Sequence, residues 1–322
     1  MLPILTFKPI YKSVIWGGRR IADFKGIPPQ GDRIGESWEI SPMPGAESIV
    51  AEGPYRGKTL NHMTELFARE LLGNKVAERF SGRFPLLVKF IDSTNDLSIQ
   101  VHPDDDMAKR HCCAPWGKTE LWYALESAPD AYLYAGFNHT ATPGGVMRCM
   151  TEGTLVDKLN RHNISPGDVV LLPAGTVHAL GKGSFVVEIQ QASDITYRLF
   201  DYDRLDDNGN PRPLHIEEAL KAIHYDSAPV KVRNVIPSPG KTLEAARSAC
   251  FSVDVISTAG NYIMDLSQRD SFTILISVEG DFKVSDALGD ITILKKGETL
   301  LVPACMSAVR IDGEGRLLAV YI

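Results

Sequence analysis

"ISPGDVVLLPAGTVHAL", residues 164–180, and "LKKGETLLVPACMSAV", residues 294–309, are two copies of one pattern at a constant offset. Each reads as a strand, a tight turn and a second strand, so the sequence predicts that one structural unit occurs twice. His178 of the first copy corresponds to Ala308 of the second, and only the first copy therefore keeps a metal-binding side chain. The other aligned positions are Gly167, Pro173 and Gly175 in the first copy and Gly297, Pro303 and Cys305 in the second.

Other short apolar runs, such as "PLLVKFI", "SFVVEIQ" and "FTILISV", are separated by turn residues at short intervals. This spacing is typical of an all-β sandwich or barrel. Two segments have helical periodicity instead: "LNHMTELFARELLG", with Gly73 as its stop, and "HIEEALKAI" after Pro213. We therefore predict a mainly β protein with a few short helices.

The chain of 322 residues is long enough for two modest domains. A polar, proline-containing segment over residues 227–242 reads as a linker. We place the boundary near residue 235. The prediction is a first domain at residues 1–235, which contains the histidine-bearing copy, and a second at residues 236–322, which contains the degenerate copy.

The composition, with 44% hydrophobic and 23% charged residues, is typical of a water-soluble protein. No apolar run approaches the length of a membrane span. The first residues lack a secretory pattern, so we expect a cytoplasmic location. A net charge of -6 gives no basic field for nucleic acid. Five cysteines without a CxxC spacing indicate reduced thiols, and neither a disulfide framework nor a cysteine-built zinc site.

The stretch "LSIQVHPDDD", residues 97–106, is the first indication of a functional site. In a strand, side chains at i and i+2 share a face, so Gln100 and His102 are expected to converge. Glu120 follows in "GKTELWY", another strand-like run, and His178 adds a second imidazole. Two imidazoles, one carboxylate and one amide oxygen form a ligand set that suits Zn²⁺ and leaves a position open for water or substrate.

A structural interpretation of each residue competes with this one. A single histidine on a strand usually belongs to the core, and Glu120 would be an ordinary surface carboxylate. We favour the metal site because the four donors occur together.

In these motifs the sequence resembles the cupin superfamily and, within it, the type I mannose-6-phosphate isomerases. The resemblance rests on G-x5-P-x-G-x2-H ending at His178, on "SIQVHPDD" and "KTE", and on the N-terminal segments "VIWGG" and "GESWEIS". It covers nearly the whole chain. It implies two cupin-like β-barrel units, the second metal-free, and one zinc ion held at Gln100, His102, Glu120 and His178. The chain lacks the large helical insertion of longer family members and resembles a short bacterial form.

The implied reaction interconverts mannose 6-phosphate and fructose 6-phosphate through a cis-enediol intermediate. The resemblance also places a functional arginine at Arg198. For the carbon base, Lys118 and Glu188 both lie in matching segments, and the sequence does not choose between them; a lysine base would need a lowered pKa. Alternatively, Lys118 pairs with the sugar phosphate and Glu188 orients His178 or Arg198. Ser98, on the strand face of Gln100, is expected to bind phosphate, with a solvated strand serine as the alternative, and Asp194 is expected to contact the substrate or orient Arg198.

Three other segments receive simpler interpretations. The acidic run after Pro103 predicts the N-terminus of a short helix. "HCC" at residues 111–113 is read as a loop, and "FDYDRLDD" at residues 200–207 as a solvated turn.

The alternatives to the isomerase are a cupin isomerase acting on another sugar phosphate, an iron-dependent oxygenase using the same pocket, and a non-catalytic sugar-phosphate-binding protein. The expected partner is a small sugar phosphate, with neither nucleic acid nor membrane, and the chain is expected to be a monomer or a homodimer.

Overall fold

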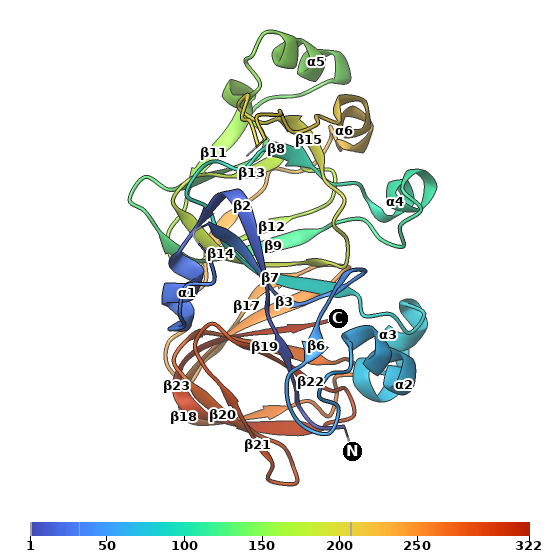
Figure 1. Ribbon diagram of the computed structural model, residues 1–322, viewed down its shortest axis with the longest axis vertical. Helices are drawn as coiled ribbons and strands as arrows, with labels where there is room; N and C mark the ends of the chain where they lie inside the picture. The colour runs from blue at the N-terminus through green and yellow to red at the C-terminus, as the bar shows by residue number, and fades with distance from the viewer. Residues whose placement is uncertain (1, 32, 207) are drawn as a thin grey trace.

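The computed structural model describes residues 2–31, 33–206 and 208–322. The protein is mainly β, as predicted, and its strands form several sheets. In Figure 1 a five-stranded sheet lies in the upper part, a seven-stranded sheet lies in the middle, and the sheet that contains the last quarter of the chain lies below them. Among the described residues, no sheet closes on itself into a complete barrel.

A seven-stranded sheet lies in the middle of the molecule (Figure 1). Every residue of its central strands β7 and β14 is buried, because both of its faces are covered. In spatial order the strands are β16 (Val232–Asn234), β12 (Asp168–Leu172), β9 (Glu120–Ser127), β14 (Ser184–Gln191), β7 (Leu86–Asp92), β3 (Ile34–Ile40) and β2 (Ile10–Gly18).

A five-stranded sheet lies above it and contains shorter strands. In spatial order these are β11 (Leu159–Asn163), β10 (Tyr132–Phe137), β13 (His178–Leu180), β8 (Ile99–Val101) and β15 (Tyr197–Phe200).

The lower sheet has nine strands, and its first strand in the sequence comes from the N-terminus. β1 pairs antiparallel with β22, so the beginning of the chain joins the sheet of the last quarter. The strands are β1 (Leu5–Lys8), β6 (Ile49–Val50), β17 (Thr242–Arg247), β18 (Ser252–Asp265), β19 (Thr273–Glu279), β20 (Phe282–Ser285), β21 (Ile291–Leu294), β22 (Thr299–Val302) and β23 (Ala308–Tyr321). A separate hairpin consists of β4 (Pro42–Met43) and β5 (Ala46–Glu47).

The repeated sequence pattern forms the same structure twice. In the first copy β12 leads through a turn to β13, which begins at His178; in the second β22 leads to β23, which begins at Ala308. Gly167 and Gly297 precede the two units with φ of +85° and +79°, a backbone region that favours glycine. The predicted strand–turn–strand repeat is confirmed, and His178 and Ala308 hold equivalent positions.

Both predicted helices are present. α2 begins after Thr59, whose side chain accepts a hydrogen bond from the His62 N–H, and it ends at Gly73, although Phe67 departs from helical geometry. The acidic run after Pro103 also begins a helix, with Asp104 as its N-cap. The helices are α1 (Arg20–Lys25), α2 (Leu60–Leu72), α3 (Asn74–Arg79), α4 (Asp105–His111), α5 (Pro143–Thr151) and α6 (Ile216–Ala222), with a 3-10 turn at Val156–Lys158.

One hydrophobic core joins the middle sheet to the lower sheet. The rings of Phe84 and Phe272 lie 4.7 Å apart across this junction. Phe90 and Phe185 of the middle sheet belong to the same buried cluster as Phe251 of the lower half. A separate core cluster lies between the five-stranded sheet and helices α5 and α6. The two halves of the chain therefore share buried apolar surface.

In the part of the chain that the structure describes, no helix has the length and apolar character needed to span a bilayer.

Candidate metal centre

Three predicted site residues occupy one row across the five-stranded sheet. Gln100 in β8 lies opposite His178 in β13 on one side and opposite Arg198 in β15 on the other. Residues directly opposite in antiparallel strands project from the same face. The register therefore places an imidazole, an amide and a guanidinium side by side, on adjacent strands.

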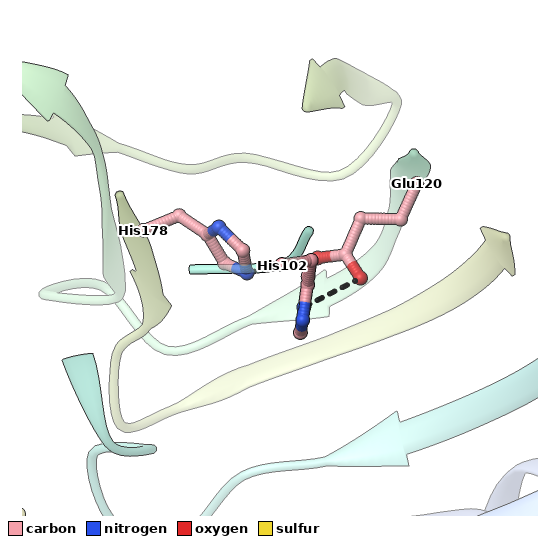
Figure 2. Close-up of side chains that lie close together, drawn as sticks. All are labelled: His102, Glu120 and His178. Atoms are coloured by element: carbon pink, nitrogen blue, oxygen red, sulfur yellow. Dashed lines mark ion pairs between the residues drawn. The ribbon is translucent and has the colours of Figure 1, made fainter. Parts of the chain in front are cut away.

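Glu120, the first residue of β9, comes from the middle sheet and meets this row from the other side. Its Oε1 lies 3.1 Å from His178 Nε2, and its Oε2 lies 3.4 Å from His102 Nε2 (Figure 2). One ligand atom from each of these three residues lies within 4.8 Å of the others, and all three residues are buried. The structure thus gathers a group from two sheets that could hold a metal ion.

Both imidazoles are oriented by main-chain carbonyls. His102 Nδ1 is 2.8 Å from the Ile195 carbonyl oxygen, and His178 Nδ1 is 2.9 Å from that of Thr176. A carbonyl can only accept, so each Nδ1 carries the proton and each Nε2 directs a lone pair toward Glu120. A metal-binding histidine is commonly held in this way by its second nitrogen.

Gln100 stands beside this cluster. Its Nε2 is 3.4 Å from His178 Nε2, and its Oε1 accepts a hydrogen bond from Ser98 Oγ at 3.3 Å. Turning the terminal amide by half a rotation would present the oxygen, the atom expected to bind a metal, to the same space.

The donor set fits a divalent ion such as zinc. Neither carboxylate oxygen of the buried Glu120 has a hydrogen-bond partner of acceptable geometry, and the carboxylate is paired with the ammonium of Lys118. Two neutral imidazoles and one carboxylate are the ligands of many catalytic zinc sites, which keep a further position for water or substrate.

Lys118 supplies positive charge at the same point. Its Nζ lies 2.8 Å from Glu120 Oε2, 3.2 Å from His102 Nε2 and 3.7 Å from Glu188 Oε1. Burial acts to lower the pKa of Lys118, but the two carboxylates outweigh burial and raise it. Burial likewise acts to raise the pKa of Glu120, but the charge of Lys118 holds it well below its usual range.

A second buried lysine was missed by the sequence analysis. Lys89 lies in β7 with its Nζ 3.4 Å from Glu188 Oε1, 3.8 Å from Glu36 Oε2 and 3.9 Å from Asp194 Oδ1. The Trp38 ring is 4.7 Å from the same ammonium. The signal was a lysine inside the apolar run "PLLVKFI", where both faces of the strand are buried.

The remaining predicted residues lie around this centre. Glu188 Oε2 accepts a hydrogen bond from Trp122 Nε1 at 3.0 Å. Asp194 is linked to the group through Lys89. Arg198 is half-buried, and its Nε is buried without a hydrogen-bond partner. Burial and the nearby Arg212 lower the pKa of Arg198.

The expectation of a solvated turn in "FDYDRLDD" is wrong for Asp201, which is only 5% exposed. Its carboxylate accepts hydrogen bonds from two arginines, Arg204 and Arg212. The segment carries opposite charges that neutralise one another, and composition alone could not reveal this pairing. Its last residue, Asp207, lies outside the described residues.

Acid should destabilise the metal-free protein through His102. Burial, followed by the charge of Lys118, lowers the pKa of His102 from 6.5 to about 3. Between these values the unfolded chain takes up a proton that the folded chain does not, so stability is lost as the pH falls. We expect the free energy of unfolding, measured by urea titration with chelator present, to decrease from pH 7 to pH 4.5, and to decrease less in His102→Gln. Equal pH dependence in both proteins would contradict this assignment.

Comparisons with known proteins agree with this geometry. Residues 4–141 match the family model "Phosphomannose isomerase type I, catalytic domain", and residues 241–322 match "Mannose-6-phosphate isomerase, cupin domain". The chain is 35% identical over 322 residues to Mannose-6-phosphate isomerase ManA of Bacillus subtilis, with 99% of this chain and 98% of that protein covered. It is 34% identical to a mannose-6-phosphate isomerase of Streptococcus mutans, with 98% and 97% covered.

A solved structure, that of the mannose 6-phosphate isomerase from Bacillus subtilis, superimposes with a TM-score of 0.89. The two chains are 35% identical, and each is fully covered by the other. The likeness therefore extends over both halves of the chain.

Proposed function

Because this chain belongs to the type I mannose-6-phosphate isomerase family, we propose that it is a zinc-dependent isomerase interconverting mannose 6-phosphate and fructose 6-phosphate. The observation that carries the proposal is the buried His102–Glu120–His178 group, whose ligand atoms lie within 4.8 Å of one another, within a chain similar to these isomerases along its whole length.

The residues that would hold the ion are His102, Glu120 and His178, with the amide oxygen of Gln100 as a fourth ligand. When bound, zinc supplies a Lewis acid that stabilises negative charge on the substrate oxygens. The orientation of both imidazoles supports this assignment, because their Nε2 atoms both face Glu120.

The isomerisation moves a proton between C1 and C2 of the sugar, by way of a cis-enediol. Lys118 lies beside two carboxylates that stabilise its ammonium, so it is suited to donate a hydrogen bond to a substrate oxygen. Glu188 is the other candidate for proton transfer at carbon. Its Oε1 lies near two buried ammonium groups, which would hold a carboxylate ionised and in place.

Arg198 is proposed to bind a substrate oxygen. Its guanidinium keeps its charge, and its unpartnered Nε supports a role as a donor. Ser98 and Lys118 are proposed to contact the phosphate, and Asp194 to orient the substrate or Arg198. Ser98 lies on the strand of Gln100 and already bonds its amide, so this hydroxyl is close to the centre.

We also propose that the chain consists of two cupin-like units, a catalytic one at residues 1–235 and a metal-free one at residues 236–322. The equivalent positions of His178 and Ala308 support this division. The shared core and the pairing of β1 with β22 make the second unit a structural support for the first.

The test is a coupled assay on chelator-treated protein, before and after zinc is added, with mannose 6-phosphate and with other aldose phosphates. Turnover of mannose 6-phosphate that depends on zinc, and exceeds that of the other sugars, is expected. Preference for another sugar phosphate would overturn mannose 6-phosphate as the proposed substrate. Binding of sugar phosphate without turnover, with zinc present, would indicate a sensor and overturn the proposal.

Arg198→Lys should lower kcat/KM by about 100-fold, because an ammonium cannot reproduce the forked hydrogen bonds of a guanidinium at a developing oxyanion. The zinc content should stay at that of the wild type, since Arg198 is not among the proposed ligands. Arg310→Lys, an exposed arginine of β23, is the matched control and should leave kcat/KM unchanged. Full activity in Arg198→Lys would remove the assigned role.

A further inference from the structure

The main chain of Arg198 is held by one residue outside the sheet. The Arg198 N–H donates a hydrogen bond to His215 Nδ1 at 3.3 Å, and the Arg198 carbonyl accepts one from the His215 N–H at 2.8 Å. β15 is the edge strand of its sheet, so no further strand lies on that side. His215 therefore takes the place of a neighbouring strand at this one residue.

His215 is brought to Arg198 by a chain that leaves the sheet after β15 and later returns to it. Asp201 lies at the point of departure, and Arg212 lies just before the point of return. Arg212 donates two hydrogen bonds to the Asp201 carboxylate, from Nε at 2.7 Å and from Nη2 at 2.6 Å. This bidentate pair, which we call the Asp201 clamp, ties the two ends of the excursion together.

The clamp is buried on the side of the carboxylate. The Asp201 side chain is 5% exposed and that of Arg212 is 23% exposed. Arg204 also donates to Asp201 Oδ1 at 2.5 Å, and its Nη1 donates to the Asp96 carbonyl. Through Arg204, the Asp201 clamp is therefore connected to the chain just before β8, the strand that contains Gln100.

The clamp also sets the electrostatic surroundings of Arg198. Arg212 opposes the positive charge on Arg198, whereas Asp201 favours it. Removing the Asp201 charge would leave Arg204 and Arg212 uncompensated next to the residue proposed to bind substrate. His215 therefore supports the main chain of Arg198, and the Asp201 clamp balances the charge around its guanidinium.

We propose that Asp201, Arg212 and His215 are positioning residues that hold Arg198 for the substrate. The inference rests on the proposed function, in which Arg198 contacts a substrate oxygen. A misplacement of a binding group by about 1 Å can lower activity by about 100-fold. The clamp therefore has a catalytic consequence although none of its members is placed at the reacting atoms.

The experiment is a double-mutant cycle on the full-length, zinc-loaded protein. Asp201→Asn and Arg212→Met should each lower kcat/KM by about 10- to 100-fold, with one zinc per chain retained. Arg212→Lys keeps the charge without the fork and should fall between Arg212→Met and the wild type. His215→Gln, whose amide oxygen can accept from the Arg198 N–H, should retain more activity than His215→Phe.

The decisive readout is coupling to Arg198. In an Arg198→Ala background, adding Asp201→Asn should change kcat/KM by less than about twofold, because the positioned group is already gone. Full additivity of the two losses would show that the clamp acts on general stability and would overturn the inference. Unchanged kcat/KM in Asp201→Asn would overturn it as well.

Arg20→Met provides a matched control. Arg20 forms a comparable pair with the buried Asp92, at 2.6 Å, with the arginine side chain 27% exposed. This variant should lower the melting temperature and leave kcat/KM within about twofold of the wild type. Absence of turnover in the wild type with zinc bound would instead overturn the proposed function itself, so the two failures are distinguishable.

Discussion

Glu120→Gln is expected to abolish zinc binding and to lower kcat/KM by about 10³-fold or more. A Lewis acid contributes several kcal/mol of transition-state stabilisation, and each 1.36 kcal/mol corresponds to about a tenfold change in rate. Glu120 is the only carboxylate in the three-residue group that could hold a metal among the described residues. Replacing it with a neutral amide removes the negative charge that offsets the ion.

The same substitution disturbs the buried charges. Lys118 would lose the carboxylate at 2.8 Å and keep only Glu188 at 3.7 Å. Breaking a buried ion pair from one side costs about 3 kcal/mol or more, so the free energy of unfolding should decrease along with activity. Metal content per chain, measured by atomic emission, and urea unfolding would check both parts of the prediction.

Glu126→Gln is the matched control, because Glu126 lies on the same strand with an exposed side chain. It should keep one zinc per chain and wild-type kcat/KM. A Glu120→Gln protein that retained zinc with high affinity and turned over substrate at the wild-type rate would contradict the assignment of this carboxylate.

Removal of residues 236–322 is expected to prevent folding of the remaining chain. Phe84 would lose the Phe272 ring, and the buried cluster that contains Phe90 and Phe185 would lose Phe251. Each lost core aromatic costs about 3–5 kcal/mol, and the loss of two, about 6–10 kcal/mol, approaches the whole stability of a typical domain.

Hydrogen bonds at the junction add to this loss. The backbone N–H groups of Ala304 and Cys305 bond the last carbonyls of α2, at Leu71 and Glu70. The Asp270 carboxylate accepts from the N–H groups of Asn74 and Lys75 at the start of α3. Circular dichroism and thermal unfolding of the fragment 1–235 should show no cooperative transition.

A control confined to the surface is replacement of the turn at residues 286–290, between β20 and β21, by Asn-Gly, a sequence that suits a tight hairpin. This change should leave the cooperative transition of the full-length chain intact. A fragment 1–235 that unfolded in one sharp transition would contradict a shared core.

Local patterns predicted much of the fold because they depend on neighbouring residues. Helix α2 and its end at Gly73 follow from periodicity and from the φ of +94° that glycine allows. The spacing of Gln100 and His102, and the repeat that ends at His178, pointed to the region where the structure gathers its metal-binding group. Strand geometry alone places these side chains on one face.

Features that depend on distant residues could not be predicted in the same way. The pairing of β1 with β22 joins the two ends of the chain, and nothing local in "LTFK" indicates its partner. Lys89 lies within an apolar strand, and its own segment gives no reason for a buried charge. Its partners Glu188 and Glu36 lie on other strands. Asp201 reads as a solvated acid because its partner Arg212 lies beyond a turn.

The most direct test of the central claim is a zinc titration of chelator-treated protein, with the initial rate of fructose 6-phosphate formation from mannose 6-phosphate measured at each step. We expect activity to rise in proportion to added zinc and to stop rising at one ion per chain, and we expect no rise for Glu120→Gln. Full activity without metal, or no activity with one zinc ion bound per chain, would contradict this claim.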